Sequence, residues 1–408
     1  MKLEPMNPQP PVTSRMDGSY SLLEVLESII AYCTPAEHTH GFMKIMVICL
    51  NVRNRISSIH NRSSCCSMTR KNILLFGGGG WIGGQLMNVL RLAGHSVSSV
   101  SSPRADDTAK VAELLDAAKP DRVVCLVGRT HGPGFPTIDY LEQPGKLVEN
   151  IQDNLYAPVS LAILCKERGI HMTYMGTGCI FEYDEAHPQD GVGATGFKEA
   201  DLPNFFGSSY SIVKGYTDRL MHLLDGSALN VRIRMPIVGE HHPRNFITKI
   251  TSYAKVCSIP NSMTVLPTLL PRLVELIDRG EVGTINLTNP GVISHNEMLE
   301  MYREIVDPAF TWANFSVEEQ NQILASQRSN NLLDTARLES LFPDVPPIRQ
   351  AVRGCLEAIR RRQDVGSADS TKTRAAEPKQ PRQPRAAKKV SESVKVGETS
   401  NKSATESS

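Results

Sequence analysis

The sequence of 408 residues lacks an excess of charge of either sign: 44 lysines and arginines are balanced by 43 aspartates and glutamates, for a net charge of +1. This balance gives no support for a nucleic acid or a membrane surface as a partner. No apolar run approaches the ~20 residues that a membrane-spanning helix needs. We therefore expect neither nucleic acid nor membrane among the partners.

The sequence also lacks a CxxC pair, although it contains nine cysteines, an odd number. With no secretory signal, these cysteines indicate reduced thiols in an intracellular protein, so we expect a cytoplasmic location and no metal site. No internal repeat is visible. The apolar content of 40% is sufficient for a sizeable core.

Two segments differ in composition from the rest of the chain. Residues 1–70 are predicted to be a poorly ordered or targeting extension: residues 21–33 have apolar side chains at helical spacing, and residues 43–71 lack acidic ones, as transit peptides do. A true start at Met68 is the alternative. Residues 364–408 are predicted to be a disordered tail, because they have almost no large apolar side chains to bury.

A glycine-rich turn follows the apolar run ILLF at 73–76: the chain continues as GGGGWIGG and then QLMNVLRLAG. The order strand, turn, helix suits a pyrophosphate at the N-terminus of the helix, which the glycines let the backbone approach. A glycine loop without a function is the alternative, but GxxGxxG is the spacing of the short-chain dehydrogenase superfamily. The predicted cofactor-binding residues here are Gly77, Gly80, Trp81, Ile82 and Gly83.

The end of the second predicted strand, 95–100, bears on the choice of cofactor. An acid there would bind the ribose and select NAD, but the chain continues as SSPRADD, with Arg104 after small hydroxyl residues. An arginine among hydroxyl groups suits a 2′-phosphate, so we expect NADPH, with NADH less favoured. The alternative is that Arg104 is an ordinary surface residue.

Strands and helices continue to alternate along the chain. We expect strands at 122–128, 171–177 and 228–234, and helices over about 145–168 and around Tyr210. Repeated β–α units favour an α/β fold with a doubly wound parallel sheet of the Rossmann type. We assign residues 71–235 to an NADP-binding domain and residues 236–363 mainly to a smaller substrate-binding region.

Thr177, Tyr210 and Lys214 have the spacing of a carbonyl reductase set. Lys214 follows Tyr210 by four residues and therefore lies on the same face of a helix. The phenol would protonate the carbonyl oxygen as hydride arrives, while the ammonium group lowers the tyrosine pKa and holds the nicotinamide ribose. A satisfied strand-end hydroxyl is the alternative for Thr177.

A reductase of this kind needs no cysteine, yet Cys179 follows the threonine by two residues. Free cysteines are usually inert core residues. This one, however, lies where a strand ends, which is where ligands bind in open α/β sheets, and a thiol there can move protons. Lys249 is the second candidate of this type, against the alternative of a solvated surface lysine.

Long motifs resemble one family: MGTGCIFEYD, GFKEADLPNFFGSSYSIVK, PRNFITKIT and NLTNPGVISHNEMLEMYREIVDP are similar, in order, to the plant and viral nucleotide-rhamnose synthase/epimerase-reductases. These are extended short-chain dehydrogenases similar to dTDP-4-dehydrorhamnose reductase. The likeness covers about residues 71–362. It implies that the protein epimerises C3 and C5 of UDP- or dTDP-4-keto-6-deoxyglucose and reduces C4 with NADPH, giving the L-rhamnose nucleotide.

The resemblance also implies residue roles. In the family, the reductase residues match Thr177, Tyr210 and Lys214, and the epimerase residues match Cys179 and Lys249.

The resemblance further suggests that Asp139 and Asn245 line the sugar pocket and that Arg328 contacts the diphosphate. It leaves three questions open: which of the two epimerase groups is the acid, which nucleotide is preferred, and whether the protein is a homodimer.

One stretch departs from the family pattern. Where the family has an NAAG-type strand end followed by Asn-Val-Asp, residues 125–139 read CLVGRTHGPGFPTID, and the loop is longer. Cys125, Leu126 and Val127 replace the polar start, and Thr137 replaces the asparagine. The departure leaves the exact substrate open, but not the reaction class.

Three rival functions share parts of this pattern. A sugar-nucleotide 4,6-dehydratase would have Asp-Glu after the threonine, where this chain has Gly178 and Cys179, so we set it aside. A 4-reductase without epimerase activity would have no need for Cys179 and Lys249. A non-catalytic regulatory subunit resembling the reductase would not need to keep the five residues, all of which are present.

Overall fold

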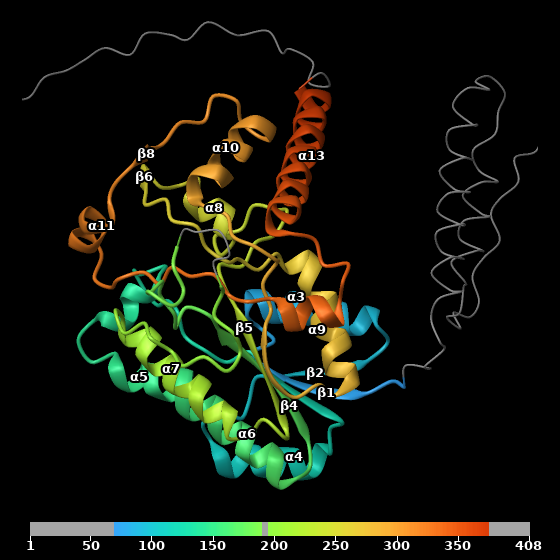
Figure 1. Ribbon diagram of the computed structural model, residues 1–408. Helices are drawn as coiled ribbons and strands as arrows, with labels where there is room; N and C mark the ends of the chain where they lie inside the picture. The colour runs from blue at the N-terminus through green and yellow to red at the C-terminus, as the bar shows by residue number, and fades with distance from the viewer. Residues whose placement is uncertain (1–68, 190–194, 375–408) are drawn as a thin grey trace, which may run out of the picture. The chain divides into compact units, whose positions relative to one another are not determined.

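Six strands form one parallel sheet in the order β2–β1–β3–β4–β5–β7 (Figure 1). They are β1 (Asn72–Phe76), β2 (Ser96–Val100), β3 (Arg122–Cys125), β4 (His171–Thr177), β5 (Ala228–Ile233) and β7 (Gly283–Asn286). The computed structural model describes residues 69–189 and 195–374. The predictions for residues 1–68, including the helix over 21–33, therefore lie outside the described residues.

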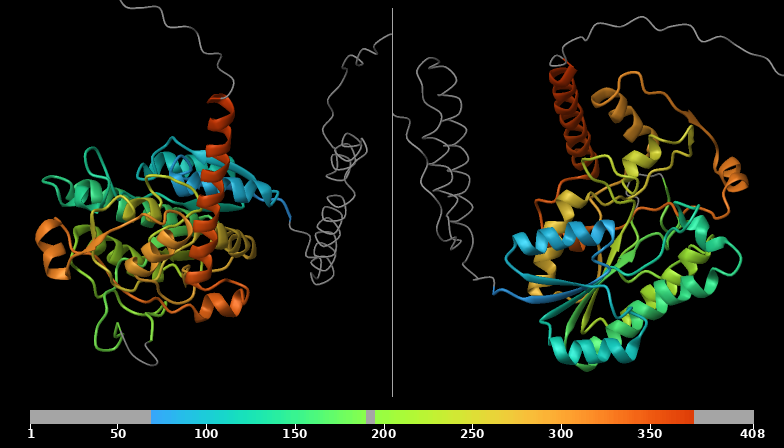
Figure 2. Two further views of the ribbon diagram at one scale, coloured as in Figure 1. Left: turned by 90° about the horizontal axis from the view of Figure 1, so that it is seen from above. Right: turned by 180° about the vertical axis from the view of Figure 1, so that it is seen from behind.

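A layer of helices covers each face of the sheet (Figure 2). One layer contains α3 (Trp81–Leu92), α9 (Leu266–Arg279) and α12 (Ala336–Leu341), and the other contains α4 (Thr108–Ala118), α6 (Ala157–Glu167) and α7 (Ser209–His222). The buried leucines of α9 at positions 266, 269, 270 and 273 have the spacing of one helix face. These layers confirm the predicted α/β fold with a doubly wound parallel sheet.

The strand order reverses next to β1, which pairs with β2 on one side and with β3 on the other. In an open parallel sheet such a reversal leaves a crevice at the carboxyl ends of the strands, which is where ligands bind. The glycine turn follows β1, and the loop that begins at Leu126 follows β3. Both therefore border this crevice.

The helix predicted over 145–168 is divided into three parts. They are α5 (Leu147–Ile151), a π-helical turn η2 (Gln152–Tyr156) and α6. Asn154 lies in the π turn and exchanges two hydrogen bonds of 2.9 Å with the backbone N–H and C=O of Arg129. The turn therefore ties this helical segment to the loop after β3.

A second, smaller core lies in the C-terminal part. It is formed by α8 (Phe246–Ile250), β6 (Lys255–Val256), α10 (His295–Ile305) and α13 (Ile348–Arg374), with β8 (Ala313–Asn314) and α11 (Val317–Ile323) in the connection that follows α10. The chain is not divided cleanly at residue 235, because α9 and β7 return to the large sheet. No helix within 69–189 and 195–374 is long and apolar enough to cross a membrane.

The predicted start of the disordered tail at residue 364 needs correction. α13 continues through residue 374, and an ion pair of 3.0 Å joins Arg360 to Asp364, four residues further on the same helix. Low apolar content does not prevent a helix from continuing where its first half is docked and such an ion pair spans the next turn. Residues 375–408 lie outside the described residues.

A buried ion pair fixes α7 on the sheet. The guanidinium of Arg232 in β5 donates two hydrogen bonds, of 2.8 and 2.7 Å, to the two carboxylate oxygens of Asp218 in α7. Both side chains are almost completely buried, and Asn230 donates a third hydrogen bond of 2.7 Å to Asp218. Because α7 carries Tyr210 and Lys214, this pair sets where those side chains lie.

We predict that Asp218→Ala lowers the free energy of unfolding by about 3–5 kcal/mol, because it leaves the guanidinium of Arg232 buried without a counter-charge. Asp116→Ala is the matched control: it removes an ion pair of 2.8 Å with Arg168, but its carboxylate is 63% exposed, so we expect a loss below about 1 kcal/mol. Urea denaturation of the two variants measures both values. Equal losses of unfolding free energy in the two variants would show that the buried ion pair contributes no more to stability than the exposed one.

Candidate active site

The glycine turn after β1 leaves no room for side chains at two positions. Gly77 has φ +87°, and a Cβ there would lie 2.9 Å from the carbonyl carbon of Leu126; a Cβ on Gly83 would lie 2.2 Å from the carbonyl oxygen of Gly77. The turn is therefore pressed against both β3 and α3. α3 begins at Trp81 and its N-cap, Gly80, has no side chain to cap it, so the first backbone N–H groups of the helix are available to an anion.

Arg104 lies after β2 and is 63% exposed. It pairs with two carboxylates, with Asp106 at 2.9 Å and with Asp153 of the π turn at 3.0 Å. Asp153 also accepts a hydrogen bond of 2.6 Å from Arg129, so it joins the two arginines. The sequence analysis missed Asp153 and Arg129, because only the fold brings the π turn next to the end of β2.

Thr177, Cys179 and Tyr210 lie together where β4 ends. The hydroxyl of Thr177 accepts a hydrogen bond of 3.1 Å from the backbone N–H of Cys179, and Ser211 donates one of 2.7 Å to the Cys179 carbonyl. Burial raises the pKa of Tyr210 and the neighbouring Cys179 adds to this, whereas a hydrogen bond with Thr177 lowers it. Two hydrogen bonds, one within the turn and one to Ser211, thus hold the turn from Thr177 to Cys179 next to the phenol of Tyr210.

Lys214 is buried one helical turn beyond Tyr210. Its ammonium group donates a hydrogen bond to the hydroxyl of Tyr174 in β4 and lies 4.6 Å from the centre of that ring. Burial lowers the pKa of Lys214 to about 8, although Cys125, Asp218 and Cys179 partly oppose the shift. Tyr174 was not predicted, since nothing in the sequence distinguishes it from an ordinary core residue.

A buried arginine lies under the same turn. Arg234 follows β5, and a Cβ on Gly178 would lie 3.1 Å from its side chain. One guanidinium nitrogen donates to Asn261 at 2.8 Å and to the Ser329 carbonyl at 2.9 Å, while Nε and Nη1 have no hydrogen-bond partner within the described residues. Burial lowers the pKa of Arg234, and Cys179 acts in the opposite direction. This positive group was also missed by the sequence analysis.

Lys249 lies in α8, a single short helix whose first turn is capped by Asn245. It is partly buried, and its pKa is lowered by burial and then by the charges of Arg244 and Arg328. Hydrogen bonds join the Thr177, Cys179 and Tyr210 segments to one another, whereas Lys249 lies in a separate group of positive side chains.

Asn245 has a different role from the predicted one of lining the sugar pocket. It is completely buried, and its amide oxygen accepts hydrogen bonds from the backbone N–H groups of Val238 and Ile247. Its amide nitrogen donates to the carbonyls of Val238 and Glu240. No group of this side chain is left for a sugar, so Asn245 positions the loop and the helix that carries Lys249.

The structure brings Asp139 and Arg328 together, although 189 residues separate them. Arg328 donates to one carboxylate oxygen of Asp139 at 2.6 Å, and the hydroxyl of Ser326 donates to the other at 2.9 Å. Thr137 donates to the same carboxylate. The two predicted substrate-binding residues therefore neutralise each other's charge.

The segment that follows the departing stretch packs against the reactive phenol. That stretch leads into η1 (Ile138–Glu142), where Tyr140 and Leu141 pack against Tyr210, and Ile138 and Cys179 pack against the edge of this cluster. Such a cover limits the access of water to the phenol.

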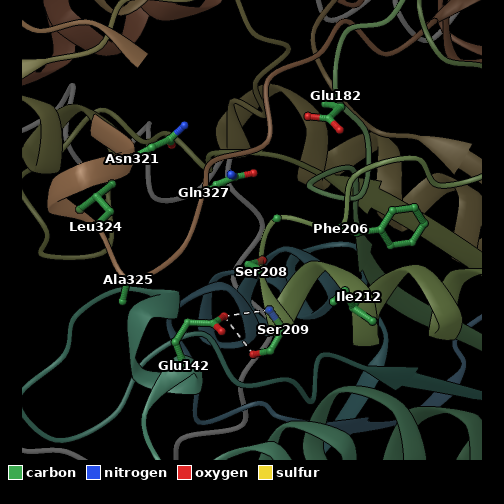
Figure 3. A pocket seen from close by; sticks show the side chains of 11 residues that line it. Glu142, Glu182, Phe206, Ser208, Ser209, Ile212, Asn321, Leu324, Ala325 and Gln327 are labelled. Carbon is green, nitrogen blue, oxygen red and sulfur yellow. Dashed lines mark hydrogen bonds between the residues drawn. The ribbon is translucent and has the colours of Figure 1, made fainter. Parts of the chain in front are cut away.

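A cleft of about 780 Å³ lies beside the start of α7 (Figure 3). Its lining comes from η1, from residues 206–212 and from the segment 321–327. Glu142 accepts hydrogen bonds from the backbone N–H and the hydroxyl of Ser209, at 2.8 and 2.9 Å. Tyr210 is the next residue, but none of the predicted catalytic side chains lines this cleft. We therefore place the candidate active site at the hydrogen-bonded residues where β4 ends, and not in this cleft.

The fold and the site together define an extended short-chain dehydrogenase: a parallel sheet with a glycine turn after β1, a threonine at the end of β4, and a tyrosine and a lysine four residues apart on α7. The sequence pattern of the family described as the RmlD substrate binding domain matches residues 71–258. Protein L780 of Acanthamoeba polyphaga mimivirus is 54% identical over 280 residues, which are 69% of this chain and 96% of that protein.

The bifunctional dTDP-4-dehydrorhamnose 3,5-epimerase/dTDP-4-dehydrorhamnose reductase of Arabidopsis thaliana is 43% identical over 282 residues, 69% of this chain and 91% of that protein. The chain belongs to the family of these nucleotide-rhamnose epimerase-reductases, which confirms the resemblance found in the motifs.

Two solved structures have a related fold. The crystal structure of the L780 UDP-rhamnose synthase superposes with a TM-score of 0.69 at 52% identity, over 71% of this chain and 99% of that one. The dTDP-4-dehydrorhamnose reductase of Bacillus anthracis, solved in complex with NADP, superposes with a TM-score of 0.58 over 70% of this chain and 98% of that one. Because the second structure is only 16% identical, it shows a shared fold alone.

The lowered pKa of Lys214 predicts how stability depends on pH. Between pH 8 and about 10.5 the unfolded lysine still binds a proton that the folded one has lost, so the free energy of unfolding should rise with pH in this window. Below pH 8 both states are charged, and the contribution of this lysine stays constant.

The measurement compares the wild type with Lys214→Met in urea at pH 7.5, 9 and 10.5. We expect the wild type to gain stability relative to the variant as the pH rises. A constant difference across the series would show that the buried lysine titrates outside this window.

Proposed function

We propose that the protein inverts C3 and C5 of UDP- or dTDP-4-keto-6-deoxyglucose and then reduces C4 with NADPH, yielding the L-rhamnose nucleotide. The observation that carries the proposal is the position of Cys179, which is fastened by Thr177 and Ser211 beside the buried phenol of Tyr210. One cluster then offers a proton-transfer group for the ring carbons and a proton donor for the carbonyl oxygen. The similarity to the Arabidopsis epimerase/reductase supports both activities.

The reduction uses groups on α7 and β4. When NADPH is bound it supplies hydride to C4, and Tyr210 donates its proton to the C4 oxygen while Thr177 donates a hydrogen bond to it. Lys214 holds the nicotinamide ribose, and its charge favours ionisation of the phenol. The hydroxyl of Tyr174 holds the ammonium group in position from the sheet side.

The epimerisation uses the same carbonyl. The C4 ketone acidifies the protons on C3 and C5, and the enolate oxygen that forms is stabilised by Thr177 and Tyr210. Inversion needs a base on one face of the ring and an acid on the other, and we assign these roles to Cys179 and Lys249. Burial and neighbouring positive charges lower the pKa of Lys249, which favours the neutral amine that a base requires.

We propose that NADPH is the cofactor. Its pyrophosphate would lie against Gly77, Gly80 and Gly83 and the first amides of α3 at Trp81 and Ile82. Its 2′-phosphate would lie near Arg104, which shares Asp153 with a second arginine, Arg129. In this division of work residues 71–235 mainly hold the cofactor, and residues 236–363 mainly hold the nucleotide sugar.

A reductase without epimerase activity is the second candidate. It is favoured by one observation: hydrogen bonds join Thr177 to Cys179 and to Tyr210, whereas Lys249 lies near the charges of Arg244 and Arg328. Such an enzyme would reduce C4 only in a substrate that another enzyme has already epimerised.

Cys179→Ala separates the two candidates. We expect it to slow deuterium entry at C3 and C5 by about 10²- to 10⁴-fold, because one acid–base group is lost. Reduction of an already epimerised 4-keto sugar should continue. Tyr210→Phe should do the opposite, losing hydride transfer while deuterium still enters more slowly.

The measurement is mass spectrometry of the sugar nucleotide recovered from D₂O. Cys165→Ala, which removes a buried thiol in α6, is the matched control and should exchange as the wild type does. If Cys179→Ala exchanges at both carbons at the wild-type rate, the second candidate replaces the first.

The cofactor proposal predicts a kcat/KM for NADPH above that for NADH. Arg104→Gln should narrow this preference by weakening the 2′-phosphate contact, whereas Arg168→Gln, at the end of α6 just before β4 begins, should leave it unchanged. Steady-state kinetics with both cofactors decide the question. A wild-type enzyme that prefers NADH would refute the proposed role of Arg104.

A further inference from the structure

The longer loop after β3 brings a histidine against an arginine of the loop before α8. Arg244 and His131 are 113 residues apart, yet Nη1 of Arg244 lies 3.1 Å from Nδ1 of His131, and Nη2 contacts Nε2 of the same ring. His131 belongs to the segment that departs from the family pattern. The guanidinium of Arg244 thus faces the ring of His131, whose unprotonated nitrogen accepts a hydrogen bond from it.

This pair belongs to a group of positive side chains that lacks a counter-charge. Within residues 69–189 and 195–374, no carboxylate forms an ion pair with Arg244, with Lys249 or with His131. The two other arginines nearby differ in this respect: Arg129 pairs with Glu149 and Asp153, and Arg328 pairs with Asp139.

Burial is the main cause of the lowered pKa of all three groups, and neighbouring positive charges add to it for His131 and Lys249. The pKa of His131 is lowered by burial and then by Arg244, Arg129 and Lys249. The pKa of Lys249 is lowered by burial and then by Arg244 and Arg328, and burial lowers the pKa of Arg244 itself. Partly buried cations that repel each other destabilise the folded protein, and a bound anion would offset this destabilisation.

A contact with the glycine turn fixes the position of Arg244. The ring of His242 stacks on Trp81, with centroids 4.9 Å apart and planes within 7°, and its Nδ1 accepts a hydrogen bond of 3.0 Å from the backbone N–H of Arg244. The backbone of Asn245 continues this turn with a hydrogen bond of 2.9 Å to the His242 carbonyl. Arg244 is therefore held beside the crevice and is not a free surface side chain.

We propose that Arg244 and His131 bind the diphosphate of the nucleotide sugar. An arginine fork matches two phosphate oxygens, and an imidazole N–H reaches a third. The proposal rests on the proposed nucleotide-sugar substrate. It moves the diphosphate contact from Arg328, whose charge is neutralised by Asp139, to Arg244 and His131, which form no ion pair with a carboxylate within the described residues.

The substrate and not the cofactor is assigned to this pair for two reasons. The pyrophosphate of the cofactor has its own place at the glycine turn, where the first amides of α3 are uncapped. The pair also lies near the proposed substrate-binding residues, because the charges of both Arg244 and Arg328 lower the pKa of Lys249. A diphosphate at Arg244 would put the sugar that it carries within reach of α8.

Isothermal titration of the full chain with UDP and, separately, with NADP⁺ tests the assignment. Arg244→Gln should weaken UDP binding by about 10- to 100-fold, the loss expected for charge-assisted hydrogen bonds to phosphate. His131→Gln should weaken it by about 3- to 10-fold. The affinity for NADP⁺ should stay within about twofold of the wild type in both variants, which also shows that they fold.

Arg168→Gln is the matched control, because it removes the same charge at the end of α6, where β4 begins and not where it ends, and it should leave UDP binding unchanged. Unchanged UDP affinity in Arg244→Gln overturns the proposal, as does an equal loss in the control. A loss confined to NADP⁺ would assign the pair to the cofactor and also overturns it. Deuterium exchange and rhamnose-nucleotide formation by the wild type are scored separately, so a failure of the proposed function is distinguishable.

Discussion

The buried ion pair between Asp218 and Arg232 is the constraint on which the site depends. It fixes the register of α7 against β5 through two short hydrogen bonds where water cannot compete. Tyr210 and Lys214 lie on the preceding turns of α7, and Arg234 follows Arg232 by two residues. A shift of one element would therefore displace the phenol, the ammonium group and the arginine under Gly178 together. The site is better described as one interface between α7 and the sheet than as separate residues.

The sequence was sufficient for features that local rules determine. The glycine turn, the placement of Tyr210 and Lys214 one turn apart on one helix, and the alternation of strands and helices follow from backbone sterics, the helical repeat and burial. The structure contains all three features. The π turn was not predicted, because its pattern of apolar residues continues through Asn154 without a signal. The helix beyond residue 364 was not predicted, because composition alone does not show that the first half of α13 packs against the second core and stabilises the turns that follow.

The missed parts of the site depend on contacts between distant residues. Tyr174, Arg234 and the pair of His131 with Arg244 look like core or surface residues until the fold brings them next to their partners. Asn245, for which the resemblance suggested a sugar contact, forms four hydrogen bonds to the backbone through its amide. A family motif can thus mark a residue that holds a loop as well as one that touches a ligand.

The stack of Trp81 on His242 has a thermodynamic consequence. It joins the glycine turn, where we propose that the cofactor binds, to the loop that carries Arg244, where we propose that the substrate binds, so ordering of either side restricts the other. Coupling between two binding sites is reciprocal by necessity. Whatever factor NADPH contributes to the affinity for the nucleotide sugar, the sugar nucleotide contributes to the affinity for NADPH. The two ligands would then load as a linked pair, and release of the oxidised cofactor would change its rate when the product leaves.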